Sequence, residues 1–180
     1  MISSTFLRAF TGIGLLSLAI VRGQQASSVP AAPKLEFVFE LTAQVSDPIK
    51  TPSAEGERRI VPVGAGTFTG PSLRGKLIPG GADYQLIHSD GFTEIEAHYV
   101  LETEQGERVS VTNKGMRHAP ADVIAKLNAG QPVDQSQIYF RTVPTFDTSA
   151  PGLKWMTRAL FICTGERYPD GVKIRFYRVY

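Results

Sequence analysis

The segment YFRTVPTFD, residues 139–147, places side chains that do chemistry among side chains that favour burial. In a strand, alternate residues share a face at a spacing of roughly 7 Å, which puts Tyr139, Arg141 and Asp147 in one row. A phenol and a guanidinium in such a row offer a proton donor and an anion-binding group. The row either faces solvent or lines a polar cavity, and the sequence leaves both alternatives open. Arg141 is the strongest single candidate for a site residue.

A second cation, Arg158, lies in LKWMTRALFICTG, residues 153–165, which is predicted as a strand. Alternation places Arg158 on a largely apolar face of this strand. We therefore expect Arg158 to form a structural ion pair with Asp147 or Asp83 rather than to bind a ligand.

Asp83 and His98 are the remaining acid–base candidates. Asp83 follows a Pro-Gly-Gly sequence, where a carboxylate either caps a turn by accepting backbone N–H groups or takes part in catalysis. The three histidines, His88, His98 and His118, lie on different predicted elements and show neither His-x-His nor His-x-x-x-His spacing. We therefore expect no metal site.

Cys163 is the only cysteine, so the chain forms no internal disulfide and no cysteine-based metal site. We expect it to be a small buried hydrophobic residue rather than a reactive thiol. The glycine-rich segment GAGTFTG, residues 64–70, lacks the Gly-Lys-Ser/Thr ending of a phosphate loop. No dinucleotide fingerprint and no Gly-x-Ser-x-Gly nucleophile motif occur either, and we expect no cofactor.

The elements that must position these groups are mainly strands. Residues 35–45, LEFVFELTAQV, alternate between apolar and polar types and predict a long half-buried strand. Residues 47–59 are predicted as an exposed loop. Residues 60–117 indicate repeated short strands, with Asp90-Gly91 as a strong hairpin signal. The glycines inside these strands, Gly64, Gly66, Gly70 and Gly75, indicate bulges or the sharp coiling of a closed barrel.

One short helix is predicted within HAPADVIAKLNAG, residues 118–130, with Pro120 at its start and Gly130 after its end. Two strands follow, then a turn at residues 168–171 and a terminal strand. The chain shows no alternation of strands and helices. The prediction is an all-β fold with one short helix, an antiparallel β-barrel of about eight to ten strands.

The first residues have the pattern of a secretory signal peptide. A basic Arg8 precedes about 13 largely apolar residues, too few for the roughly 20 that span a bilayer, and small residues favour cleavage after Gly23. We expect a signal peptide at 1–23, a flexible lead-in at 24–33 and a single barrel domain at 34–180. The mature protein would be secreted or lie in the lumen of the secretory pathway, outside the membrane.

Cleavage of the signal peptide would remove Arg8 and Arg22, so the formal net charge of the mature chain would fall from +2 to 0. A neutral surface with interspersed charges gives no electrostatic footprint for nucleic acid or anionic lipid. We expect neither as a partner.

Several segments, in order, resemble the DUF3237 (UPF0311) family of small β-barrel proteins. They are GPSLRG at 70–75, PGGADY at 79–84, Asp90-Gly91, YFRTVPTFD at 139–147 and Trp155. The resemblance runs from about Leu35 to Val179, which is nearly the whole mature chain. It implies a compact lipocalin-like β-barrel and little about activity, because the family is named for its unknown function.

Three functions are compatible with these residues. In the first, the barrel holds a small molecule and acts as a cofactor-independent isomerase, cyclase, dehydratase or hydrolase on a phenolic or enolic metabolite. Its catalytic set would be Arg141, Tyr139, Asp83 and His98. In the second, the protein is a non-catalytic secreted carrier or sequestering protein for a small apolar ligand. In the third, it is a homo-oligomeric structural or interaction protein whose polar row is solvated.

Overall fold

The computed structural model describes residues 29–71 and 73–180. Residues Pro33–Tyr180 form one compact unit. The predicted signal peptide at 1–23 and the first part of the predicted lead-in at 24–33 lie outside the described residues. Within the part of the chain that is described, no helix has the length and hydropathy needed to cross a membrane.

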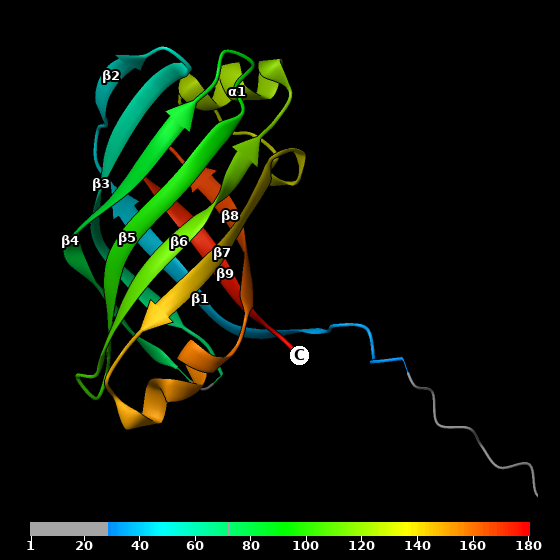
Figure 1. Cartoon of the computed structure of the whole chain (residues 1–180). Coiled ribbons are helices and arrows are strands. Elements are labelled where there is room, and N and C mark those ends of the chain that lie inside the picture. Colours follow the sequence, from blue (N-terminus) through cyan, green and yellow to red (C-terminus); the bar gives the residue numbers. More distant parts are fainter. Residues whose placement is uncertain (1–28, 72) are drawn as a thin grey trace, which may run out of the picture. The chain divides into compact units, whose positions relative to one another are not determined.

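Nine antiparallel strands account for most of this unit (Figure 1). They are β1 (Leu35–Val45), β2 (Ile49–Ser53), β3 (Gly56–Thr69), β4 (Arg74–Ile87), β5 (Thr93–Thr103), β6 (Arg108–His118), β7 (Tyr139–Asp147), β8 (Phe161–Tyr168) and β9 (Gly171–Val179). Their order is β1-β9-β8-β7-β6-β5-β4-β3-β2, and β1 also pairs with β3. Eight strands therefore close into a barrel, with β2 as an extra strand on β3, and the predicted fold class is confirmed.

The helix is also confirmed, as α1 (Ala121–Asn128), preceded by Pro120 and followed by Gly130 at a positive φ of 69°. Its buried residues Val123 and Leu127 belong to the hydrophobic core. Two short 3₁₀ helices complete the unit, η1 (Gln135–Gln137) and η2 (Pro151–Arg158). Figure 1 shows α1 at one end of the barrel and η2 at the opposite end. We call these the α1 end and the η2 end.

Two predictions about local structure were wrong. Part of the predicted loop at 47–59 forms β2 and the start of β3, and β2 tolerates Pro52 because it is an edge strand. The predicted strand at 153–165 begins only at Phe161, because Pro151 starts the helix η2. Arg158 therefore ends a 3₁₀ helix, where it is exposed and makes no ion pair with another described residue.

The inward faces of the strands fill the barrel with apolar side chains. Phe39 of β1 stacks on Phe176 of β9 with ring centroids 4.2 Å apart, and it contacts Phe68 of β3 at 5.4 Å. All three rings are buried. Phe39 therefore packs against both strands with which β1 pairs, β9 and β3, inside the barrel.

Closure brings β1 and β3 very close at Gly66, which pairs with Ala43 of β1 beside a bulge in β3. A Cβ atom on Gly66 would lie 2.4 Å from the carbonyl oxygen of Thr42. The two strands can therefore meet there only if residue 66 has no side chain, as the sequence pattern of glycines within strands indicates.

This close approach predicts the effect of two matched substitutions. Gly66→Ala should lower the free energy of unfolding by about 1–3 kcal/mol, because the added methyl group forces the strands apart. Gly64→Ala is the control, since a Cβ atom there meets Gln44 at 3.5 Å, an ordinary van der Waals distance. Urea unfolding of both variants measures the difference, and equal destabilisation would contradict the close approach of β1 and β3.

Candidate functional site

The polar row of β7 lies on the outer wall of the barrel. Along this strand Phe140, Thr142 and Phe146 are buried, whereas Tyr139, which is 44% exposed, belongs to the opposite face with Arg141. Arg141 donates a hydrogen bond from Nη1 to the carbonyl oxygen of Phe140 at 2.8 Å. Its guanidinium carbon lies 5.2 Å from the centre of the Tyr139 ring. Of the two alternatives for this row, the outward one is therefore observed.

His98 also lies on the outer wall, on β5. Its Nε2 is 3.0 Å from a carboxylate oxygen of Glu96, and its Nδ1 is 3.2 Å from the hydroxyl of Thr112. Of the four predicted catalytic residues, only Asp83 points into the barrel. The four side chains therefore do not form one site, and a role for Tyr139, Arg141 or His98 in binding stays a prediction about the outer wall.

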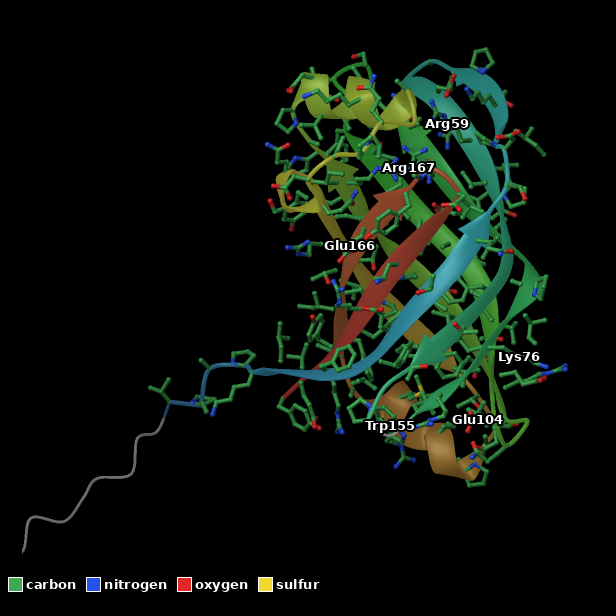
Figure 2. The ribbon with its side chains drawn as sticks, turned by 180° about the vertical axis from the view of Figure 1, so that it is seen from behind. Arg59, Lys76, Glu104, Trp155, Glu166 and Arg167 are labelled. Atoms are coloured by element: carbon green, nitrogen blue, oxygen red, sulfur yellow. The ribbon has the colours of Figure 1, made fainter. Side chains whose placement is uncertain are left out.

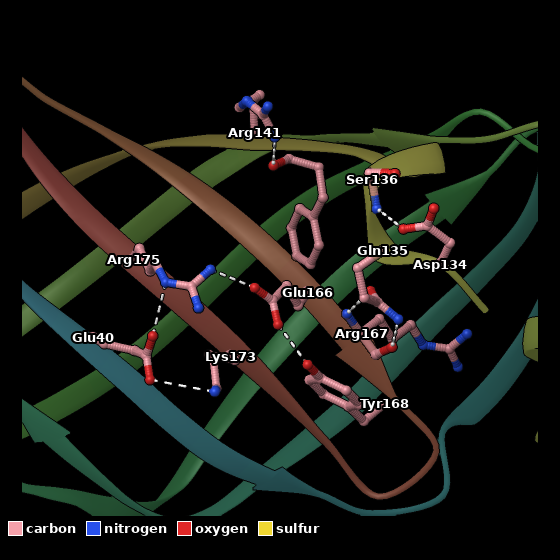
Figure 3. Close-up of polar contacts among 11 residues, drawn as sticks. Glu40, Asp134, Gln135, Ser136, Arg141, Glu166, Arg167, Tyr168, Lys173 and Arg175 are labelled. Atoms are coloured by element: carbon pink, nitrogen blue, oxygen red, sulfur yellow. Dashed lines mark hydrogen bonds and ion pairs between the residues drawn. The ribbon is translucent and has the colours of Figure 1, made fainter. Parts of the chain in front are cut away.

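Charged side chains on the outer wall are largely paired with one another, as Figure 3 shows for β1, β8 and β9. Glu40 accepts from Arg175 Nε at 2.8 Å and lies 3.4 Å from Lys173. Arg175 also pairs with Glu166, which accepts a hydrogen bond from the Tyr168 hydroxyl. Exposed pairs of this kind contribute roughly 0.2–1 kcal/mol each, so we interpret this network as surface structure.

A concavity of about 720 Å³ on the outer wall is an open groove that includes Ile49 of β2 and Ile60 of β3. Its charged groups are already satisfied within the surface, for example by the 3.0 Å pair between Lys114 and Glu96. The barrel interior holds a smaller cavity, of about 50 Å³. We place the candidate site in this inner cavity, because its polar groups are buried and lack partners.

Four polar side chains line the inner cavity, among otherwise apolar ones: Asp83 of β4, Tyr99 of β5, Asn113 of β6 and Thr142 of β7. Each has a buried oxygen atom without a hydrogen-bond partner in the described part of the chain. An unsatisfied buried polar group costs about 1–3 kcal/mol. Four such oxygens around one cavity make it the candidate functional site of the described residues.

Asp83 is oriented by its neighbour on the same face of β4. Gln85 donates from Nε2 to Oδ2 of Asp83 at 2.5 Å, which leaves Oδ1 without a partner. Burial raises the pKa of the Asp83 carboxyl, and the Gln85 hydrogen bond and the charge of Arg117 oppose this only in part. Desolvation of a carboxylate is the usual cause of such a rise. A buried carboxyl group that lines a cavity is a candidate general acid–base group.

Burial also raises the pKa of the Tyr99 phenol, and the neighbouring Asn113 side chain opposes this in part. Tyr99 is therefore a neutral hydrogen-bond donor at every physiological pH. Cys163, on the inward face of β8, is fully buried as predicted, and burial raises the pKa of its thiol to about 12. It is a core residue rather than a nucleophile.

Sequence reasoning found Asp83 but missed Tyr99, Asn113 and Thr142. The available signal was a polar residue on the buried face of an alternating strand. Asn113 shares its face with Val109 and Val111, and Thr142 shares its face with Phe140. Such residues are rarely buried without a partner, so they mark candidate sites.

In residues 29–71 and 73–180, no three His, Cys, Asp or Glu side chains come together in a way that could hold a metal ion. The inner cavity has a single carboxylate and no histidine among its lining residues. The arrangement fits hydrogen bonding and proton transfer to an organic molecule better than metal coordination.

Comparison with known proteins places these residues in a family context. Residues 33–179 match the family described as "Protein of unknown function (DUF3237)". A UPF0311 protein from Rhodopseudomonas palustris (strain TIE-1) is 41% identical over 152 residues, which cover 82% of this chain and 98% of that protein.

Solved structures show the same fold. A conserved protein of unknown function from Rhodopseudomonas palustris superposes with a TM-score of 0.80 at 36% identity, covering 84% of this chain and all of that one. A structure described as an enzyme from Penicillium herquei superposes with a TM-score of 0.63 at 19% identity, covering 85% of this chain and 98% of that one. At this identity, the second likeness concerns the fold alone.

The raised pKa of Asp83 predicts a pH-dependent difference between the wild type and Asp83→Asn. A carboxyl whose pKa is raised in the folded state binds its proton more tightly there, so wild-type stability declines as pH rises above the usual value of 3.8. The asparagine variant cannot ionise and lacks this decline. Urea unfolding from pH 4 to 8 should therefore show the variant gaining stability relative to the wild type as pH rises. A relative loss with rising pH would contradict a raised Asp83 pKa.

Proposed function

The chain belongs to the DUF3237 family, also called UPF0311, and from this premise we propose that its barrel binds a small molecule whose polar end enters the inner cavity. We further propose that the protein is an enzyme acting on a phenolic or enolic metabolite. Isomerisation or cyclisation of such a molecule relocates a proton without a redox change. Dehydration and hydrolysis use the same groups, with water as the product or co-substrate.

The observation that carries this proposal is the set of four oxygens around one cavity that have no hydrogen-bond partner in the described residues. A cavity of about 50 Å³ has room for a few water molecules or for the polar end of a ligand. Beside these oxygens, burial raises the pKa of the Asp83 carboxyl, which lines the same cavity. Perturbed carboxyl groups in cavities are concentrated at functional sites.

Asp83 has the geometry of the acid–base group. Gln85 holds Oδ2, so Oδ1 is the oxygen that exchanges a proton with the ligand. In a ring closure or isomerisation, Oδ1 accepts the proton from the ligand's hydroxyl or acidic carbon and returns it to another ligand atom. The Tyr99 hydroxyl donates a hydrogen bond to the oxygen on which negative charge develops. No electrons are gained or lost overall.

The Penicillium herquei protein supports the catalytic version only at the level of the fold. Its description as an enzyme shows that a barrel of this architecture can carry catalysis. Because unrelated functions share folds, this likeness names no substrate for the present chain.

A non-catalytic carrier is the second candidate, favoured by the apolar side chains that make up the rest of the cavity wall, including Leu41, Leu77 and Ile174. In that case, the four polar groups would orient a ligand without changing it. The two functions share the same binding site and differ only in whether Asp83 exchanges a proton with the ligand.

Native mass spectrometry of the protein purified from its source tests the binding site. We expect the wild type to retain a small molecule. Asp83→Asn and Tyr99→Phe should each lower its affinity by about tenfold or more, because each removes a hydrogen bond to a buried ligand. Asp147→Asn and Tyr139→Phe are matched controls on the exposed face of β7. Loss of the ligand only in these outer variants would place the site on the outer wall.

The same preparations separate enzyme from carrier. If the wild type converts the identified molecule and Asp83→Asn does not, the protein is an enzyme. If the molecule leaves both forms unchanged while Asp83→Asn still weakens its binding, the protein is a carrier.

A further inference from the structure

We propose that the ligand of this barrel carries a carboxylate, held at the α1 end by the guanidinium groups of Arg117 and Arg167. The inference rests on the proposed small-molecule function and adds the chemical class of the ligand. It comes from cations that face the interior without matching carboxylates.

Arg117 lies on the inward face of β6, two positions beyond Gly115 and four beyond Asn113. It is only 5% exposed, and its guanidinium carbon lies 5.8 Å from the centre of the Phe140 ring. Its Nε has no hydrogen-bond partner in the described residues, and none of their carboxylate oxygens lies within 4.0 Å of its nitrogens. A buried arginine left in this state is costly, because its charge has lost water and gained no counterion.

The guanidinium of Arg117 nevertheless stays protonated. Burial and the like charge of Arg167 lower its pKa to about 10, so the group is cationic at neutral pH. The charge of Asp83 acts on Arg117 in the opposite direction, and the Arg117 guanidinium lies over Phe140, which lines the inner cavity together with Asp83. An anion at Arg117 would therefore lie beside the proposed acid–base group.

Arg167 lies on the inward face of β8, two positions beyond the buried Gly165. Its main chain is fixed by the Gln135 side chain, which accepts from the N–H and donates to the carbonyl oxygen, each at 3.0 Å (Figure 3). Burial and the charge of Arg59 lower the pKa of Arg167. Figure 2 shows Arg59 and Arg167 at the end of the barrel that α1 covers.

Three arginines lie close together at this end. Besides burial, the charges of Arg167 and Arg59 lower the pKa of Arg117, and the charge of Arg59 lowers that of Arg167. The carboxylates that act on them are Glu57, which is already paired with Arg59, and Asp83, whose pKa is itself raised. One anionic group from a ligand would satisfy Arg117 and Arg167 together. A planar carboxylate suits the fork of guanidinium donors better than a neutral amide or alcohol does.

Acetate and acetamide are a matched pair of probes, since they have the same shape and differ in charge. We would follow the side-chain Nε–Hε resonances of Arg117 and Arg167 by NMR at constant chloride concentration. Arg58, with its side chain 60% exposed on the same strand as Arg59, is the internal control. We expect saturable shifts at Arg117 and Arg167 with acetate, at least about tenfold weaker binding of acetamide, and no saturable shift at Arg58.

Two variants test the assignment. Arg117→Met should weaken acetate binding at least about tenfold, because the cation that is most deeply buried is lost. Arg167→Gln gives a second test on a half-buried residue in case Arg117→Met does not fold, and Arg58→Gln should bind acetate as the wild type does. Equal binding of acetate and acetamide, unsaturable shifts at all three arginines, or unchanged affinity in Arg167→Gln would overturn the inference.

This experiment is independent of the test of the proposed function. A retained neutral molecule that depends on Asp83, together with no acetate site, would leave the proposed function standing and remove the carboxylate inference. If acetate binds saturably at Arg117 but the retained ligand binds Asp83→Asn and Tyr99→Phe as tightly as the wild type, the anion site stands and the proposed function fails.

Discussion

Closure of the sheet by β1 is the constraint on which the rest of the structure depends. Because β1 pairs with both β9 and β3, eight strands share one interior, and each strand must divide its residues between that interior and the outer wall. An eight-stranded barrel is just wide enough for side chains to fill or for one small ligand. A polar side chain that faces inward is therefore cut off from water, and it needs a partner inside the barrel.

The contrast between the two sides of the wall follows from this constraint. Outside, cations such as Arg175 meet carboxylates on neighbouring strands and remain partly hydrated. Inside, three atoms are buried without a hydrogen-bond partner in the described residues: Nε of Arg117, the hydroxyl oxygen of Tyr99 and Oδ1 of Asn113. Isolated buried polar groups reduce stability, and their grouping around one cavity and one barrel end is the basis on which we propose a binding site.

Local chemistry made part of this fold predictable. The Asp90-Gly91 hairpin and the helix ending before Gly130 are specified by residues that are adjacent in sequence. The alternation in residues 139–147 marked the face with Phe140 and Phe146 as core. It left open whether the row of Tyr139 and Arg141 faces solvent or a polar cavity, which only the closed barrel decides.

The inner site was harder to predict, since it joins residues from four strands. Asp83 was found because it follows a turn signal, whereas Asn113 and Thr142 sit singly among apolar residues of separate strands. Their convergence depends on the register between strands, and a single sequence contains no direct record of that register.

Bromide-soaked crystals would test the central claim most directly, because anomalous scattering locates bound anions without reference to any ligand. The account predicts a bromide ion inside the barrel beside Arg117 and Arg167, and bromide bound only to arginines of the outer wall would contradict it.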